Sequence, residues 1–235
     1  MDFDFLKDFD FLKDCVGKIG VELTRENCES LARYYEMVVE KNKAFNLTAI
    51  TEEKDFAIKH ITDSLAGISE IPQNTMLLDI GAGAGFPSMP IAIVRRDVSV
   101  TALDSTAKKM NFISECAREL KIDNIKTIAG RAEEQRNLFS QFDVVTARAV
   151  SALNILLELA IPLLKVGGRF VAYKTDESEL GSAKSALETL GAKHVSTKSL
   201  SLPNGDSRAI MVFEKITPTP KQYPRLYGAI KKKPL

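Results

Sequence analysis

The chain has 235 residues, of which 45% are hydrophobic and 27% charged, and its formal net charge is +1. A chain of this length can bury a sizeable core, and its composition excludes disordered, collagen-like and disulfide-rich proteins. The three cysteines are far apart and no histidines cluster with them, so the sequence predicts neither a metal site nor a disulfide framework.

Charge is distributed unevenly along the chain. Residues 1–30 hold eight acids against four bases, whereas residues 215–235 hold six bases and no acid. A basic tail on a nearly neutral body fits either a polyanionic partner or a solubilising surface. The start of the chain is acidic, unlike a secretory signal, and the most apolar stretch, 152–164, is too short and interrupted to span a bilayer. We therefore expect a cytoplasmic protein without a membrane segment.

Helical patterns dominate the first 72 residues. The segment 2–8 recurs as 8–14, which indicates a small duplication or a cloning scar. Residues 24–41 carry apolar side chains on one helical face, with Thr24 as a candidate cap, and a second helical stretch is predicted over 56–68. We interpret 1–72 as an N-terminal helical subdomain that ends at Pro72.

From residue 75 onward, short apolar runs alternate with helical patterns. This alternation predicts an α/β fold with a mostly parallel sheet covered by helices on both faces. A turn at 203–206 joins the last two strands into an antiparallel hairpin. The main domain is expected over 73–216 and a basic tail over 217–235. The expected strands are 76–80, 98–103, 126–128, 142–146, 169–172, 195–202 and 209–214, and the expected helices between them include 107–120 and 152–164.

A glycine loop follows the first predicted strand. Gly81, Gly83 and Gly85 alternate before Phe86-Pro87, and glycines let a ligand approach the backbone closely. The spacing fits neither the dinucleotide fingerprint nor the phosphate loop of nucleotide hydrolases. Instead, the loop is similar to the first motif of class I S-adenosylmethionine-dependent methyltransferases.

An acid ends each of the next two predicted strand regions. Asp104 lies about twenty residues beyond the loop, where a carboxylate can accept both ribose hydroxyls. A nicotinamide dinucleotide would also fit this pair. Ala132 and Glu133 follow the third strand, where class I methyltransferases read the adenine edge. Glu133 could equally favour the start of a helix.

Several longer motifs occur together and in order along the chain. They are NLTAI at 46–50, KHITDSL at 59–65, DIGAGAGFP at 79–87, DVVTARAV at 143–150, YPRLYG at 223–228 and KKPL at 232–235. Together they resemble the RsmG (GidB) family of bacterial 16S rRNA guanine-N7 methyltransferases over nearly the whole chain. The N-terminal duplication and the tail segment 226–230 depart from the family pattern.

The resemblance implies a Rossmann-like class I methyltransferase with a seven-stranded sheet. It implies S-adenosylmethionine as cofactor, with Gly81, Phe86, Ala132, Glu133 and Arg148 as binding positions. Gly83 of the loop and Asp104 complete the predicted cofactor-binding residues. It also implies that the substrate is one guanine, conventional position 527, in the decoding-region hairpin of 16S rRNA. In the family, loss of this methylation is associated with low-level streptomycin resistance.

The residues after the fourth predicted strand bear on the reaction. The segment 146–149 lacks the Asn/Asp-Pro-Pro-Tyr/Phe clamp of exocyclic-amine methyltransferases, and no cysteine is placed as a nucleophile for C5 methylation. Guanine N7 carries a free lone pair and no proton, so positioning and electrostatics suffice. We therefore predict no acid–base residue. Arg148 is the candidate positioning residue, although a surface ion pair would also explain it.

The RNA contacts predicted from the sequence come from three regions. Single-stranded RNA is recognised by stacking on aromatic and arginine side chains and by phosphate contacts. His60 and Asp63 could share a helix face and either brace the helical subdomain or line the RNA cleft. The RNA-binding candidates are His60, Lys174, Arg225, Lys232 and Lys233.

Two other functions compete with this prediction. One is a class I methyltransferase acting on another RNA or on a small molecule, and the other is a non-catalytic RNA-binding module. The expected partner is 16S rRNA or the 30S particle, and nothing in the sequence indicates an obligate dimer.

Overall fold

The computed structural model describes residues 9–235 and contains one seven-stranded sheet. The first copy of the N-terminal duplication therefore lies outside the described residues. The strand order is β3-β2-β1-β4-β5-β7-β6, and β7 runs antiparallel to both of its neighbours while the other pairings are parallel. The strands are β1 Met76–Ile80, β2 Ser99–Asp104, β3 Ile125–Ala129, β4 Phe142–Arg148, β5 Leu164–Lys174, β6 Ala192–Ser201 and β7 Ser207–Lys215.

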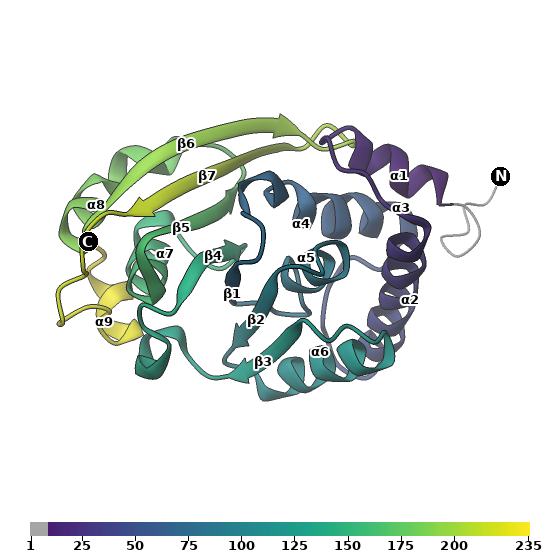
Figure 1. The fold of residues 1–235 in the computed structure, drawn as a ribbon, viewed down its shortest axis with the longest axis horizontal. Coiled ribbons are helices and arrows are strands. Elements are labelled where there is room, and N and C mark those ends of the chain that lie inside the picture. Colours follow the sequence, from purple (N-terminus) through teal and green to yellow (C-terminus); the bar gives the residue numbers. More distant parts are fainter. Residues whose placement is uncertain (1–8) are drawn as a thin grey trace.

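Helices cover both faces of this sheet (Figure 1). The α-helices are α1 Asp10–Gly17, α2 Arg25–Asn42, α3 Glu53–Phe56, α4 Asp63–Leu65, α5 Ser88–Val94, α6 Ala107–Glu119, α7 Leu153–Ala160, α8 Lys184–Leu190 and α9 Tyr227–Lys232. A π-helical turn, η1 Ala57–Thr62, joins α3 to α4. The short 3₁₀ segments are η2 Ile68–Glu70, η3 Ala132–Glu134, η4 Arg136–Leu138, η5 Ile161–Leu163 and η6 Ser178–Ala183.

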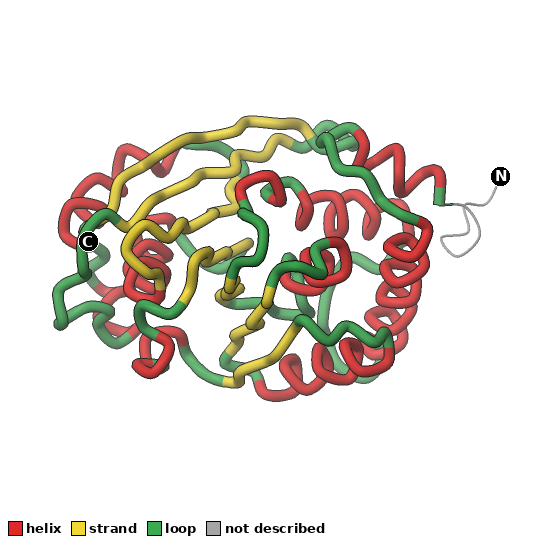
Figure 2. The backbone as a smooth tube through the Cα atoms, in the orientation of Figure 1, coloured by secondary structure: helices red, strands yellow, loops and turns green. Residues whose placement is uncertain are grey.

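Two hydrophobic clusters lie on the two sides of the sheet. One joins α1, α2 and the α3–α4 region to α5 and α6, and it includes Tyr34, Phe56 and Ile91. The other packs α7 and α8 against the opposite face and includes Leu156, Phe170 and Phe213. Figure 2 shows the same arrangement, with the yellow strands running between the red helices of the two sides. The N-terminal helices therefore share their core with the sheet.

The predicted α/β architecture and its terminal hairpin agree with this structure. The helix predicted over 24–41 is α2, where Thr24 and Asn27 form a reciprocal capping box. The second predicted helix is wrong in its details, because residues 53–65 pass through α3, the π turn and α4. The helix predicted over 152–164 ends at Ala160 and gives way to η5, since Pro162 has no N–H for helical pairing. No helix among residues 9–235 is long and apolar enough to cross a membrane.

Candidate active site

The glycine loop leaves β1 and turns back over β2. The backbone N–H groups of Gly81 and Ala82 donate to the Leu103 carbonyl at 2.8 and 3.1 Å. Gly81 and Gly83 have positive φ values of 69° and 59°, which side chains with a Cβ rarely adopt. A Cβ on Gly81 would lie 2.5 Å from Val150, whereas one on Gly83 would approach only a carbonyl oxygen at 3.8 Å. The loop is therefore tightly packed at Gly81 and open at Gly83.

The N-terminal helix α2 supports this loop from behind. The buried Tyr34 hydroxyl donates to the Ala84 carbonyl, and its ring packs against Phe86 at a centroid distance of 5.6 Å. A Cβ on Gly85 would collide with the Tyr34 hydroxyl. The helical region thus fixes the shape of the loop as well as contributing to the core.

Asp104 ends β2 directly beside the loop. Its carboxylate accepts hydrogen bonds from the Gly83 N–H at 3.1 Å and the Thr106 N–H at 2.8 Å. Each carboxylate oxygen keeps acceptor capacity beyond these bonds. Asp104 is only partly buried and lines the adjoining cleft, so its carboxylate is free to accept further hydrogen bonds, and its contact with a ribose stays a prediction.

Two clefts meet at the carboxyl ends of β1, β2 and β4. The first, which we call the loop cleft, has a volume of about 340 Å³ and is lined by Gly83, Phe86, Asp104 and Arg148 among others. The second, the β3 cleft, has a volume of about 230 Å³ and is lined by Ala132 and Glu133 among others. Gly81, Asp104 and Val150 line both clefts. The two form an elongated site that brings together all seven predicted cofactor positions.

The residues of this elongated site fit S-adenosylmethionine. Gly83 leaves room for a ligand near the backbone, Asp104 offers a carboxylate at its middle, and Ile80, Leu103 and Leu159 give the β3 cleft apolar walls. A ribose needs the carboxylate and an adenine needs the apolar walls. Tyr227, from the C-terminal helix α9, also lines the β3 cleft, and the Arg131 guanidinium lies 5.8 Å from its ring centroid.

A larger basic cleft adjoins the loop cleft. It has a volume of about 400 Å³ and shares His60, Arg148 and Ala149 with the loop cleft. Four cationic side chains line it against only two acidic ones, and Ile50, Leu156 and Tyr173 add apolar surface. The cations are Lys59, Arg148, Lys174 and Arg208, and the acids are Asp63 and Glu179. This combination suits a planar base with nearby phosphates.

Arg148 stands between the loop cleft and the basic cleft. Its Nη1 donates to the Lys59 carbonyl at 2.8 Å and to Asp63 Oδ2 at 2.9 Å. Its guanidinium carbon lies 5.6 Å from the Phe86 ring centroid. The buried Asp63 also accepts from Arg208 Nε at 2.9 Å, so one carboxylate holds two arginines from β4 and β7. This network makes Arg148 a fixed element of the cleft wall.

His60 is held in one tautomer by its two neighbours. Arg148 Nη2 can only donate, at 3.3 Å, so His60 Nδ1 accepts and Nε2 carries the proton that it donates to Thr48 Oγ1 at 2.7 Å. Its ring stacks on Phe86 at a centroid distance of 4.2 Å. Burial and the Arg148 charge lower the pKa of His60 to about 3. His60 is therefore neutral at physiological pH and has no free lone pair with which to act as a base.

Asp79 lies beneath the loop, within the sheet. It accepts hydrogen bonds from the Ser88 N–H at 3.1 Å and the Thr146 hydroxyl at 3.0 Å. Burial raises the pKa of its carboxyl from 3.8 to about 7. Asp79 lines neither of the adjoining clefts, so its contacts support a structural role in joining β1, β4 and the start of α5.

The RNA-binding candidates lie in different surroundings. His60 and Lys174 both line the basic cleft, and Lys174 also pairs with Glu179 at 2.5 Å. Arg225, in contrast, holds the fully buried Glu158 through Nε at 2.8 Å and Nη2 at 2.6 Å, which gives it a structural partner. Lys232 and Lys233 are exposed at the end of α9. Their contact with RNA stays a prediction.

The structure also adds residues that the sequence analysis did not select for the site. Arg208 reaches the basic cleft from the distant strand β7, and Tyr227 reaches the β3 cleft from the tail. Thr48 and Val150 line the loop cleft. Thr48 and Val150 belong to motifs that carried the family resemblance, so those motifs could have pointed to them. No local pattern marks Arg208.

Comparisons with known proteins place the chain in a family. The family model of rRNA small subunit methyltransferase G, GidB, matches residues 27–211. The ribosomal RNA small subunit methyltransferase G of Streptococcus sanguinis is 46% identical over 92% of this chain and 94% of its own length.

Solved structures show the same fold. The structure of M. jannaschii TYW2 in complex with AdoMet has a TM-score of 0.51 and 19% identity, covering 61% of this chain and 70% of that chain. A precorrin-6y C5,15-methyltransferase from Geobacter metallireducens has a TM-score of 0.51 and 16% identity, covering 74% of this chain and 95% of that chain. The fold is therefore that of a Rossmann-like class I methyltransferase. The family match extends this to function: the chain belongs to the GidB family of rRNA small subunit methyltransferases and is an S-adenosylmethionine-dependent enzyme.

Proposed function

We propose that this protein methylates N7 of one guanine, conventional position 527, in the decoding-region hairpin of 16S rRNA. The observation that carries the proposal is the junction of the loop cleft with the basic cleft at His60 and Arg148. One side of this junction fits the methyl donor, and the other combines cations with apolar walls. An unstacked RNA base with its flanking phosphates needs such a combination.

The chemistry at this junction requires no proton transfer from guanine. S-adenosylmethionine supplies an electrophilic methyl group on a sulfonium, and guanine N7 offers a lone pair without a proton. The side chains at the junction are correspondingly committed to structure: both His60 nitrogens are hydrogen-bonded, and Asp63 is bound by two arginines. In our proposal Arg148 is a positioning residue that holds the base against the methyl donor.

The tail and the basic cleft make RNA a better acceptor than a small molecule. Lys232 and Lys233 are exposed at the end of α9, the short helix that begins with the β3 cleft residue Tyr227. We propose that the enzyme acts as a monomer in the cytoplasm, on 16S rRNA either free or within the 30S particle. Phosphate contacts from these lysines would make its activity fall steeply with salt.

A methyl-transfer assay tests this function. Labelled S-adenosylmethionine is incubated with 30S subunits that lack the modification, and the product nucleoside is identified and mapped. The expected result is 7-methylguanosine at the decoding hairpin. The Gly81→Ala variant should abolish transfer, because its Cβ would lie 2.5 Å from Val150. Gly17→Ala is the matched control, since its Cβ meets no atom within 4 Å. Transfer to another nucleoside, or to another site, would refute the proposal.

A further inference from the structure

A fourth pocket lies at the opposite edge of the sheet from the active site. It has a volume of about 270 Å³ and is lined by Lys215, Arg136, Lys221, Ser140 and Thr219 among others. Lys215 ends β7, and Ser140 lies just before the start of β4. Arg148 and Lys174 mark the other ends of β4 and β5. This Lys215 pocket is therefore separate from the clefts described above.

Lys215 is the unusual member of this pocket. Its residue is only 1% exposed, and among the residues that the structure describes we find one hydrogen-bond partner for its ammonium, the Leu164 carbonyl at 2.8 Å. An ammonium has three donors, and a buried charge is costly unless it is paired. Burial accordingly lowers the pKa of Lys215. A bound anion would supply the missing partner.

The rest of the lining is suited to such an anion. Arg136 and Lys221 bring two more cations, and no acidic residue lines this pocket within residues 9–235. The Arg136 guanidinium lies 5.6 Å from the Phe139 ring centroid, which helps to hold it in place. Ser140 and Thr219 add hydroxyl groups. Three cations with two hydroxyls match the several acceptor oxygens of a tetrahedral oxyanion.

We propose that the Lys215 pocket binds a phosphate group. The phosphate could belong to the RNA backbone or to a small phosphorylated molecule, and both present the same oxygens to Lys215. The exposed positions of Arg136 and Lys221 leave the pocket open to either source. The site is distinct from the methyl-transfer cleft, and phosphate binding does not depend on the identity of the methylated base.

Thermal unfolding of the full chain in inorganic phosphate tests the site. At constant ionic strength, phosphate at ten times its Kd should raise the Tm of the wild-type protein by roughly 3–6 °C. Lys215→Met should lose this increase. It should also have a higher Tm than wild type without phosphate, because it removes an unpaired buried cation. Lys221→Gln changes an exposed residue and should weaken phosphate binding without affecting folding.

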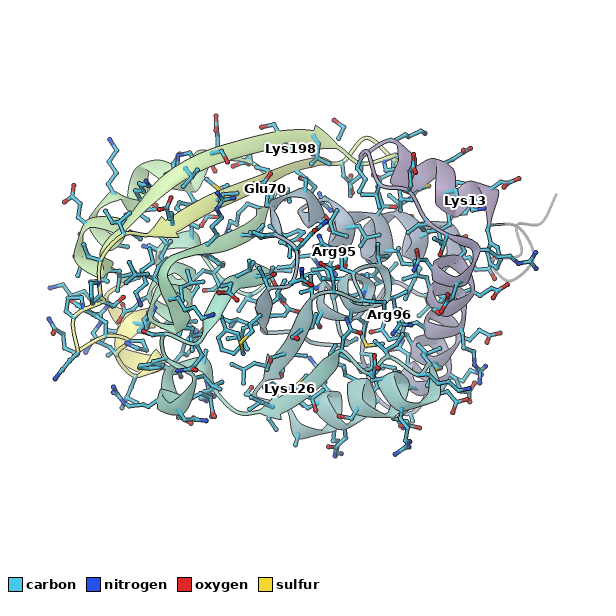
Figure 3. The ribbon with its side chains drawn as sticks, viewed as in Figure 1. Lys13, Glu70, Arg95, Arg96, Lys126 and Lys198 are labelled. Carbon is cyan, nitrogen blue, oxygen red and sulfur yellow. The ribbon has the colours of Figure 1, made fainter. Side chains whose placement is uncertain are left out.

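The matched control is Lys198→Gln, which removes an exposed charge from β6 and is labelled in Figure 3. Lys198 pairs with Ile210 of β7, whereas Lys215 pairs with Ala192, so the two lysines lie at different points along the β6–β7 ladder. This variant should keep the full phosphate response. Equal phosphate-induced shifts in wild type, Lys215→Met and Lys221→Gln would overturn the proposal, as would the absence of any shift in the wild-type protein.

A second arm identifies the source of the phosphate. If it is the RNA backbone, Lys221→Gln should raise the KM for 30S subunits several-fold. The slope of log KM against log salt concentration should also fall by about the amount expected for one lost phosphate contact. If it is a small molecule, ribose 5-phosphate should reproduce the thermal shift in the wild-type protein but not in Lys215→Met, while the KM for 30S stays unchanged. Because the thermal arm needs no methylation, failure of this site and failure of the proposed function are distinguishable.

Discussion

At the scale of single residues, the active site depends on buried charges with fixed partners. Arg148 contacts a backbone carbonyl, a carboxylate and an imidazole at once. A planar guanidinium holds its donors in a fixed fork that reaches partners spaced apart, whereas lysine carries its three donors on one compact ammonium. The geometry of these contacts, and not the charge alone, should therefore matter for the cleft wall.

Arg148→Lys tests this point. We expect it to lose most of the methyl-transfer activity despite keeping the charge, and to cost about 2–4 kcal/mol of stability because Asp63 and His60 lose a partner. Circular dichroism and urea unfolding measure the stability, and kcat and KM for 30S measure the function. Arg208→Lys is the control in the same cleft, since it leaves Arg148 on Asp63. Full activity in Arg148→Lys would contradict a positioning role.

The buried carboxyl of Asp79 should make the stability of the protein depend on pH. The pKa of its carboxyl is about 7 in the folded protein against 3.8 in the unfolded chain. Between these values the folded state binds the proton more strongly, so this group's contribution to stability falls as pH rises from about 4 to about 7. Each pKa unit corresponds to about 1.4 kcal/mol.

The Asp79→Asn variant should not show the loss of stability that the Asp79 carboxyl causes as pH rises. We expect its free energy of unfolding, relative to wild type, to increase between pH 4 and pH 7 by up to a few kcal/mol and then to level off, as measured by urea unfolding at a series of pH values. Asp97→Asn is a control of opposite sign. Its ion pair with Arg95 lowers the pKa of Asp97 to about 2, so that variant should lose stability relative to wild type as pH rises through 2–4. Parallel profiles for wild type and Asp79→Asn would refute the assignment.

At the scale of elements, the C-terminal segment closes the β3 cleft. The ion pair between Arg225 and the buried Glu158 fixes this segment on α7, and α9 then brings Tyr227 to the cleft lined by Ala132 and Glu133. The tail, which the sequence suggested as an RNA-binding extension, therefore also contributes to the wall of the β3 cleft.

Tyr227→Ala should weaken S-adenosylmethionine binding. An aromatic ring stacked on a base contributes about 1–3 kcal/mol, so we expect the Kd to rise roughly 5- to 140-fold. Calorimetric titration of the donor measures the change without RNA. Tyr227→Phe keeps the ring and should bind as wild type does. An unchanged Kd in Tyr227→Ala would mean that the ring does not contact the adenine.

The same scale shows where sequence reasoning succeeds. The strand–loop–helix pattern around Gly81 and the acid at Asp104 are local signals, and the parallel sheet necessarily brings the strand ends together. The π turn, with its i→i+5 hydrogen bonds, was missed because a change of pairing over six residues is too short to be seen in an apolar periodicity. Arg208 and the Arg225–Glu158 pair were missed because they depend on contacts between distant segments, which local periodicity does not encode.

At the scale of the whole molecule, the predicted boundary at residue 72 does not separate two cores. The buried side chains of α2 and the α3–α4 region lie in one cluster with those of α5 and α6. Asn27 Nδ2 also donates to the Ile93 carbonyl at 3.1 Å, which joins the start of α2 to α5. The helical region and the sheet should therefore depend on each other for stability.

Calorimetry tests this dependence. We expect one thermal transition with equal calorimetric and van't Hoff enthalpies, because two-state unfolding follows when a single core melts as a unit. Leu31→Ala, in the shared cluster, should lower the free energy of unfolding by about 2–5 kcal/mol and shift the single transition to lower temperature. Leu156→Ala, in the cluster on the other side of the sheet, is the matched control and should lower the same transition to a similar extent. Two resolved transitions, with Leu31→Ala shifting only one of them, would instead show that residues 1–72 fold independently. In that case the support of the glycine loop by Tyr34 would be a contact between separate units, and it would not reflect one cooperative structure.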